Sequence, residues 1–336
     1  MNKKSLKLNA VLNVIKQLCV IAFPIITFPY ASRVLGVNNY GKINFSSSII
    51  SYFSLLAALG ITNYAIREGA RIRNYKEKLN IFVNEIYSLN LISTIISYTL
   101  LFLSILFFDN LHSYFLLLII QSLSIFFTTI GTDWINSIYE EYSFITIRYI
   151  ICQTFSIIFM FIFVKDRNDY YVYAFSTVLS LIVANTWNIF HIKYKYGLNV
   201  KFQLSKGIRK HIKPVLILFA SSIASLIYIN SDMTILGVFK TDSDVGIYSV
   251  SVKIYSLIKQ LINAVLIVAI PHISSLMLKK KKNELQEKLI SLYTFLLLFT
   301  PSAIVGLFFL SEPLIRLFAG KEYISSNDSL QILAIS

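Results

Sequence analysis

The feature that most constrains the fold of this chain is a series of long apolar stretches separated by short polar segments. A helix that crosses the hydrocarbon core of a bilayer needs about 20 mostly apolar residues, and stretches of this length recur from one end of the sequence to the other. With 56% apolar and only 14% charged residues among 336, the chain is too apolar for a soluble protein of its size. The pattern predicts an integral membrane protein that crosses the bilayer many times.

The expected fold class is all-α, because runs such as 116–120 are apolar on every face and a helix satisfies all its own backbone groups in lipid. We expect about nine to ten helices. The predicted spans are 10–31, 43–64, 81–108, 114–132, 149–164, 171–190, 214–236, 247–270 and 290–310. A tenth span begins near Leu330 and is cut off, so we expect a truncated C-terminus.

Lysine and arginine favour cytoplasmic loops, and here they are divided very unevenly between the two sides that the spans define. Alternate connections, counted from the N-terminus, place 21 basic residues on one side and 7 on the other. The basic side, which includes the N-terminus, is therefore expected to be cytoplasmic. This topology explains the net charge of +14, so no nucleic-acid partner is expected, whereas anionic membrane lipids are natural partners.

Polar residues inside three spans share helix faces. Polar residues at helical spacing predict a helix with one face toward water or other polar groups. The span 247–270 has the longest such series, or stripe, of polar residues. Its members are Ser249, Lys253, Ser256, Gln260 and Asn263. The span 214–236 has a similar stripe made of Ser221, Ser225, Tyr228 and Asp232. The first span repeats the pattern with Asn9, Asn13, Lys16 and Thr27.

A charge at the bilayer centre costs about 2.5–3.5 kcal/mol on insertion scales and normally faces protein or water. The position of Lys253 deep in an apolar span therefore favours a polar cavity beside it. Two simpler explanations stay open: Lys16 can extend to the interface, and Asp232 can be an interfacial cap or a partner for Lys253. Small polar residues can also serve close helix packing alone.

An internal repeat divides the chain. Leu35-Gly36-Val37 followed by Tyr40-Gly41 recurs as Leu236-Gly237-Val238 followed by Val245-Gly246. Six crossings separate the two copies, so both have the same orientation. Parallel repeats about an axis along the membrane normal are a transporter architecture. We expect two pseudo-symmetric six-helix lobes, an N-terminal lobe at 1–200 and a C-terminal lobe at 201–336 that is incomplete, with about three to four helices.

Several segments resemble bacterial polysaccharide repeat-unit flippases of the multidrug, oligosaccharidyl-lipid and polysaccharide exporter superfamily. These segments are 29–36 with 40–41, Asp133-Trp134, 145–148, and 232–237 with 245–249 and Lys253. The resemblance covers essentially the whole chain. It implies a MATE-like bundle that moves undecaprenyl-diphosphate-linked oligosaccharide across the bacterial cytoplasmic (inner) membrane for O-antigen, capsule or exopolysaccharide synthesis. A polysaccharide polymerase is a further partner on this interpretation.

The same resemblance implies roles for further residues. A diphosphate headgroup calls for cations, which makes Lys16, Arg33 and Lys253 candidate cavity residues, and the sugar hydroxyls call for hydrogen-bonding groups such as Asn13, Gln260 and Asn263. Asp232, which begins one of the matching segments, is a further candidate. Asp133 and Trp134 become candidates for an inner gate. Arg33 and Trp134 can instead be interfacial anchors, because basic and aromatic residues often lie at headgroup level.

Other functions are less well supported by the residues. The phosphate-binding loop of ATPases is missing, so ATP hydrolysis is not expected, and the resemblance implies a transporter and not an enzyme. The two cysteines and four histidines predict no metal or cofactor site. The histidines are expected to be solvated surface residues. A peptidoglycan-precursor flippase and a multidrug antiporter of the same superfamily remain alternatives. A membrane polysaccharide polymerase would be expected to show a large external loop, and the external loops here are short.

Overall fold

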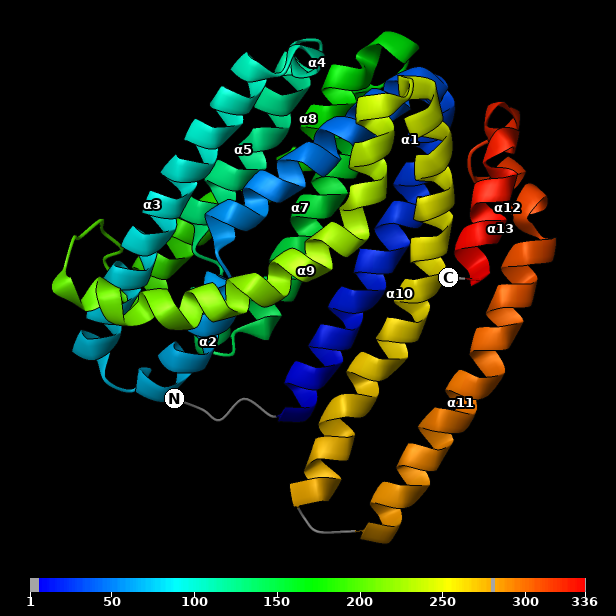
Figure 1. Ribbon diagram of the computed structural model, residues 1–336. Helices are drawn as coiled ribbons and strands as arrows, with labels where there is room; N and C mark the ends of the chain where they lie inside the picture. Colours follow the sequence, from blue (N-terminus) through cyan, green and yellow to red (C-terminus); the bar gives the residue numbers. More distant parts are fainter. Residues whose placement is uncertain (1–5, 279–281, 336) are drawn as a thin grey trace. The chain divides into compact units, whose positions relative to one another are not determined.

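The computed structural model describes residues 6–278 and 282–335. All regular secondary structure in these residues is helical (Figure 1), which confirms the all-α prediction. The α-helices are α1 (Leu6–Ala58), α2 (Ile61–Ile72), α3 (Lys76–Phe107), α4 (Asp109–His112), α5 (Phe115–Gly131), α6 (Trp134–Ile138), α7 (Tyr142–Phe163), α8 (Tyr170–His191), α9 (Arg209–Phe239), α10 (Asp242–Leu278), α11 (Lys282–Phe309), α12 (Ser311–Phe318) and α13 (Asn327–Ile335). Short 3-10 helices cover Arg167–Asp169, Lys206–Ile208 and Lys321–Ser326, and one π-helical turn covers Ile192–Tyr196.

Within the described residues, six helical stretches are long and apolar enough to cross a bilayer, judged by length and composition. The helix α5 is also apolar but has only 17 residues. Each predicted span from 81–108 onward corresponds to one helix, with bounds that differ by between one residue and about two turns. The prediction of many crossings is therefore confirmed: this is a multi-pass membrane protein.

The first predicted span, 10–31, lies within α1, but the loop expected after it and the second span, 43–64, were predicted wrongly. Residues 32–42, expected to be a loop, are helical except at Gly36, whose φ of 71° and ψ of 171° break α1 into two helices. The span 43–64 is interrupted by Leu59 and Gly60, both with positive φ. Asn90 and Ser93 of α3 donate hydrogen bonds to the carbonyl of Ala57 at 2.8 and 2.6 Å. They satisfy a carbonyl that the end of a helix leaves without an intrahelical partner.

The chain forms two compact units. The central unit contains Lys42–Asp242, and the terminal unit combines the residues up to Gly41 with those from Ser243 onward. This grouping follows contacts, whereas the lobes predicted at 1–200 and 201–336 follow the internal repeat. The division into lobes remains a prediction.

In the central unit, α5 packs against α3 and α8, and α7 packs against α8. The short helix α2 has one apolar face, with Ile61 and Ala65 buried in a core that also contains Ile138 of α6. Gly69 allows the close approach of α6, since a Cβ atom there would lie 2.2 Å from Ile138 Cδ1. The polar face of α2 carries Arg67, Glu68 and Arg71, so this helix is amphipathic and was missed by a search for uniformly apolar stretches.

In the terminal unit, α12 and α13 pack against each other and against α11. Tyr323 is fully buried, and its hydroxyl donates a hydrogen bond to the carbonyl of Ser32 in α1 at 2.9 Å. The helices α1 and α10 meet at Gly246, where a Cβ atom would lie 2.1 Å from the carbonyl oxygen of Val37. Gly246 of the internal repeat therefore allows the close packing of these two helices.

Candidate substrate-binding residues

The polar stripe of α10 changes from buried to exposed along the helix. Ser249 is 3% exposed and donates to the carbonyl of Gly246 at 2.8 Å. Lys253 and Gln260 are half-buried, and Asn263 at the far end is exposed. The structure thus places these three candidate cavity residues on one helix of the terminal unit.

Lys253 is the charged residue of this stripe. Within the described part of the chain, no hydrogen bond or ion pair to its ammonium group is found, although the side chain is half-buried. Ser256 does not serve it, because that hydroxyl donates to the backbone carbonyl of Lys253 at 2.8 Å. A half-buried ammonium group in an apolar helix is expensive unless an anion or water meets it.

The first helix contributes Lys16, which is half-buried, whereas the side chains of Asn9 and Asn13 lie outside the described residues. Beside Lys16, Gln17 lines a pocket of about 680 Å³ in the terminal unit. The pocket is bounded by α1, α10 and α11, and Ala264 and Val265 line it directly after Asn263. Its wall is mostly apolar, and its other polar lining residues are Lys288 and Ser291 of α11.

Arg33 lies in a structural contact. One of its guanidinium nitrogens donates to the carbonyl of Leu317 at 2.5 Å and approaches that of Arg316 at 3.4 Å. Both carbonyls belong to the last turn of α12, whose negative dipole end favours a cation. Arg33 therefore stabilises the end of α12, and its role in a substrate cavity remains a prediction.

Asp232 belongs to the central unit, on α9. One of its carboxylate oxygens accepts a hydrogen bond from the backbone N–H of Met233 at 2.8 Å, and the residue is half-buried. Ser221, Ser225 and Tyr228, which share its face of the helix, are exposed. The polar side of α9 is therefore accessible over most of its length.

Asp133, the first predicted inner-gate residue, belongs to a hydrogen-bonded network where α5, α6, α7 and α8 meet. It accepts from Arg148 at 2.5 Å and from Asn136 at 2.9 Å. Asn136 also donates to Asn188 at 2.6 Å, and Asn188 donates to the carbonyl of Gly131 at 2.6 Å. Arg148, which was counted among the basic residues of the cytoplasmic side and expected just before the span 149–164, is buried in the second turn of α7.

Trp134, the second predicted inner-gate residue, is only 5% exposed and packs in the core with Ile135 and Ile138. Its indole N–H has no hydrogen-bond partner among the described residues. Nearby, Tyr139 stacks on Tyr196 with ring centroids 4.1 Å apart, and burial raises the pKa of Tyr139. Trp134 thus has the surroundings of a core residue, and a gating role is still a prediction.

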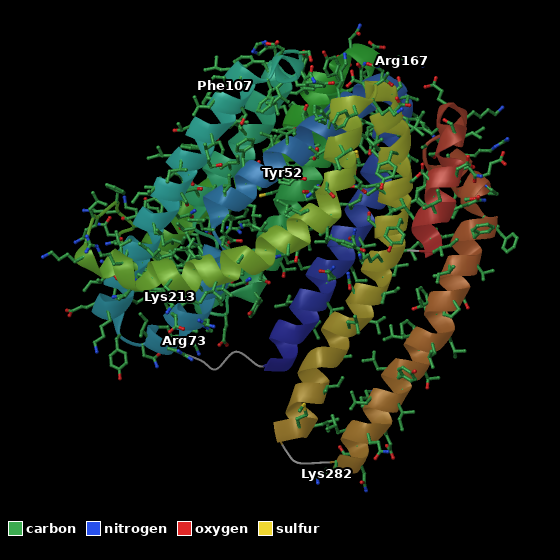
Figure 2. The ribbon with its side chains drawn as sticks, viewed as in Figure 1. Tyr52, Arg73, Phe107, Arg167, Lys213 and Lys282 are labelled. Carbon is green, nitrogen blue, oxygen red and sulfur yellow. The ribbon has the colours of Figure 1, made fainter. Side chains whose placement is uncertain are left out.

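The sequence reasoning missed one polar cluster altogether. His211, expected to be a solvated surface residue, is 3% exposed and lies 3.0 Å from Glu85 of α3. The other imidazole nitrogen lies 2.7 Å from the hydroxyl of Tyr64. Sequence separations of 126 and 147 residues hide these partners; the available signal was an acidic residue within an otherwise apolar span. Figure 2 labels Lys213, which lies two residues beyond His211 on α9.

Comparison with known proteins identifies a matching family model and similar relatives. The family model described as "Polysaccharide biosynthesis protein" matches residues 6–277. Two relatives carry the name "Putative O-antigen transporter". The one from Shigella dysenteriae is 25% identical over 92% of this chain and 76% of its own length, and the one from Escherichia coli (strain K12) is 25% identical over 82% and 66%.

A solved structure has a similar fold. The crystal structure of MATE in the bent conformation matches 97% of this chain and 76% of that chain, with a TM-score of 0.50 and 15% identity. At this identity the match concerns the fold, and it agrees with the predicted MATE-like helix bundle. The chain spans about two thirds to three quarters of the length of the two relatives.

Proposed function

Because this chain belongs to the polysaccharide biosynthesis protein family, we propose that it transports lipid-linked oligosaccharide repeat units across a membrane and is not an enzyme. The finer proposal is a flippase for undecaprenyl-diphosphate-linked units in the bacterial cytoplasmic membrane, with the N-terminus in the cytoplasm. The product would serve O-antigen, capsule or exopolysaccharide assembly, and a polymerase would be a downstream partner. The names of the two relatives support the O-antigen branch.

The observation that carries this proposal is the ammonium group of Lys253, which has no partner among the described residues. A diphosphate presents oxygens that accept charge-assisted hydrogen bonds from a lysine, and such bonds are roughly twice as strong as neutral ones. Gln260 and Asn263 continue the same face of α10 and can donate to and accept from sugar hydroxyls. In this scheme the substrate lies between the two predicted lobes, as in other transporters built from repeats.

The test replaces Lys253 by methionine, which keeps an unbranched apolar stem and removes the charge. Bacteria that lack their own full-length gene would carry wild type, Lys253→Met, or Lys259→Met. Lys259 is the matched control, because it lies on the same helix, is exposed, and stacks its ammonium group over the Tyr255 ring at 5.8 Å. Surface glycan, membrane protein level and cytoplasmic-side repeat units would be measured together.

We expect Lys253→Met to lower surface glycan about tenfold or more at equal protein level, the change that the loss of one hydrogen bond to a charged group would give. Repeat units should accumulate on the cytoplasmic side, while Lys259→Met behaves as wild type. Normal surface glycan in Lys253→Met would overturn the assignment of this residue. Single repeat units accumulating on the outer side of cells lacking the gene would indicate a polymerase or ligase and overturn the transport proposal.

A further inference from the structure

The connection between α8 and α9 is bound to α3 by a regular set of hydrogen bonds. The backbone N–H groups of Asn199, Lys201 and Gln203 donate to side chains of α3 at 3.3, 3.0 and 2.7 Å. The accepting side chains are those of Asn80, Asn84 and Ser88. Alternate residues of an extended chain thus meet every fourth residue of a helix, and we refer to these three contacts as the ladder.

A buried cluster follows the ladder directly. Glu85, with 6% of its side chain exposed, accepts from the Ser205 hydroxyl at 2.7 Å and lies 3.0 Å from both Lys210 Nζ and His211 Nε2. Gly207 lies against this carboxylate, since a Cβ atom there would come within 1.8 Å of Glu85 Oε1. The cluster therefore fixes the chain where it enters α9.

The hydrogen-bond pattern of the cluster identifies the neutral form of His211 as the form that fits. An ionised Glu85 only accepts, so Nε2 carries a proton and donates to it; Nδ1 then accepts from the Tyr64 hydroxyl. In this state one carboxylate faces one ammonium group and the charges balance. The remaining charged groups acting on the cluster are Arg67 and Glu68 on α2.

A proton added to the imidazole would disturb this arrangement in two ways. Nδ1 would become a donor facing a hydroxyl that already donates to it, so Tyr64 would have to rotate its O–H away. The cluster would also hold two cations against one carboxylate in a buried place, which is unfavourable. Lys210 is the group able to leave, because 63% of its side chain is exposed.

We propose that the His211–Glu85 pair is a proton-binding site, and that its protonation loosens the connection between α8 and α9 from α3. An unperturbed imidazole titrates close to physiological pH, and because the cluster described above favours the neutral ring, protonation of His211 is expected under acidic conditions. Acidification would release Lys210, then Ser205 and the ladder, and free the first turn of α9. This inference concerns the central unit alone and does not depend on which substrate is carried.

Hydrogen exchange on the complete chain in lipid nanodiscs tests the proposal. The amides of Asn199, Lys201 and Gln203 would be followed between pH 8 and pH 5.5, with rates corrected for the intrinsic dependence on pH. For wild type we expect protection to fall about tenfold or more toward acid pH, the effect of losing one hydrogen bond to a charged group. Amides in the middle of α8 provide the internal reference.

Two variants give opposite results. His211→Gln keeps one donor and one acceptor but cannot take up a proton in this range, so its ladder should stay protected across the whole pH interval. Tyr64→Phe removes the donor that opposes protonation, so the loss of protection should begin at higher pH than in wild type. His112→Gln is the control, since His112 is an exposed histidine of α4 whose Nδ1 lies 3.8 Å from Asp109.

Protection that is independent of pH in wild type, or equal pH dependence in wild type and His211→Gln, would overturn the proposal. If His211→Gln does not insert or fold, the direction of the Tyr64→Phe shift decides: no shift, or a shift to lower pH, also counts against a proton on His211. Glycan transport is not needed as a readout. A failure here is therefore distinguishable from a failure of the proposed transport function.

Discussion

Buried and half-buried charged side chains have different surroundings in the two compact units. In the central unit, Arg148 pairs with Asp133 and Glu85 pairs with Lys210 and His211, so ions are met by partners within the unit. In the terminal unit, the half-buried Lys253 has no such partner among the described residues. The contrast concerns these residues: the carboxylates and cations named for the central unit meet each other, whereas for Lys253 no partner is found in the described part of the chain.

This difference separates structural polar residues from candidate functional ones. A side chain whose hydrogen bonds are all made within the protein stabilises the fold and has little left to offer a ligand. Ser93, Ser97 and Asn90 of α3 are examples, because each donates to a backbone carbonyl of α1. A charge without a partner costs free energy of folding and is retained for another reason. Four substitutions compare the two units: three change a charged side chain, and one changes the packing at a glycine.

The largest effect on stability is expected for Asp133→Ala. It leaves the guanidinium of Arg148 buried and without its carboxylate, so the free energy of unfolding should fall by about 3 kcal/mol, near the lower end for buried pairs because Asp133 is 44% exposed. Denaturant unfolding in detergent measures it. Adding Arg148→Met to Asp133→Ala should restore a large part of the lost stability. If the double substitution instead costs as much as the sum of the two single substitutions, the two side chains do not act as a pair.

The next largest effect is expected for Gly131→Ala at the end of α5. The new Cβ atom would lie 2.3 Å from Asn185 Oδ1, and such overpacking typically costs about 1–3 kcal/mol. Thermal unfolding is the measurement. Gly306→Ala in α11 is the control from the terminal unit, because a Cβ atom there meets nothing within 4 Å; it should be neutral or slightly stabilising. Equal destabilisation by Gly131→Ala and Gly306→Ala would show that the close contact between Gly131 and Asn185 does not cause the loss of stability.

A smaller and local effect is expected for Arg33→Gln. The variant loses the cation at the end of α12, an interaction worth about 0.3–1 kcal/mol when exposed. Hydrogen exchange should become faster in the last turn of α12, while α8 stays unchanged. Unaltered exchange in α12, combined with loss of transport, would favour the substrate-cavity role that the sequence suggested for Arg33.

The smallest effect on stability, or a change of opposite sign, is expected for Lys253→Met. Removing a half-buried charge without a partner takes away a desolvation cost, so the unfolding midpoint should stay the same or rise. The same variant should lose transport, as proposed above. A clear loss of stability would mean that Lys253 is structurally compensated and would remove the contrast between the two units.

Much of the fold could be predicted from the sequence, because the thickness of the bilayer sets the length of a spanning helix, and apolar stretches of that length are visible in the hydropathy pattern. The errors at 32–42 and 43–64 have a common cause. The breaks at Gly36 and at Leu59 with Gly60 are single-residue backbone changes that leave the apolar pattern intact. Hydropathy also misses the amphipathic α2, whose apolar residues face only one side.

The candidate site was predictable to a lesser degree. Helical spacing assigned Lys253, Gln260 and Asn263 to one helix, and all three lie on α10, because that assignment depends only on local geometry. Their role in a substrate site remains a prediction. Partners are a different matter, since Arg33 meets Leu317 across 284 residues and Glu85 meets His211 across 126. No local pattern encodes such pairs, so structural and functional charges look alike in the sequence.

The ladder on α3 has a consequence for how this chain can vary. Two residues of an extended strand advance by about 6.6 Å, and four residues of a helix advance by about 6 Å, so the two repeats stay in step over three contacts. The donors are backbone groups, which makes the side chains of Asn199, Lys201 and Gln203 replaceable. One inserted residue, however, would turn every following N–H away from α3. The connection between α8 and α9 is therefore expected to tolerate changes of residue type but not of length.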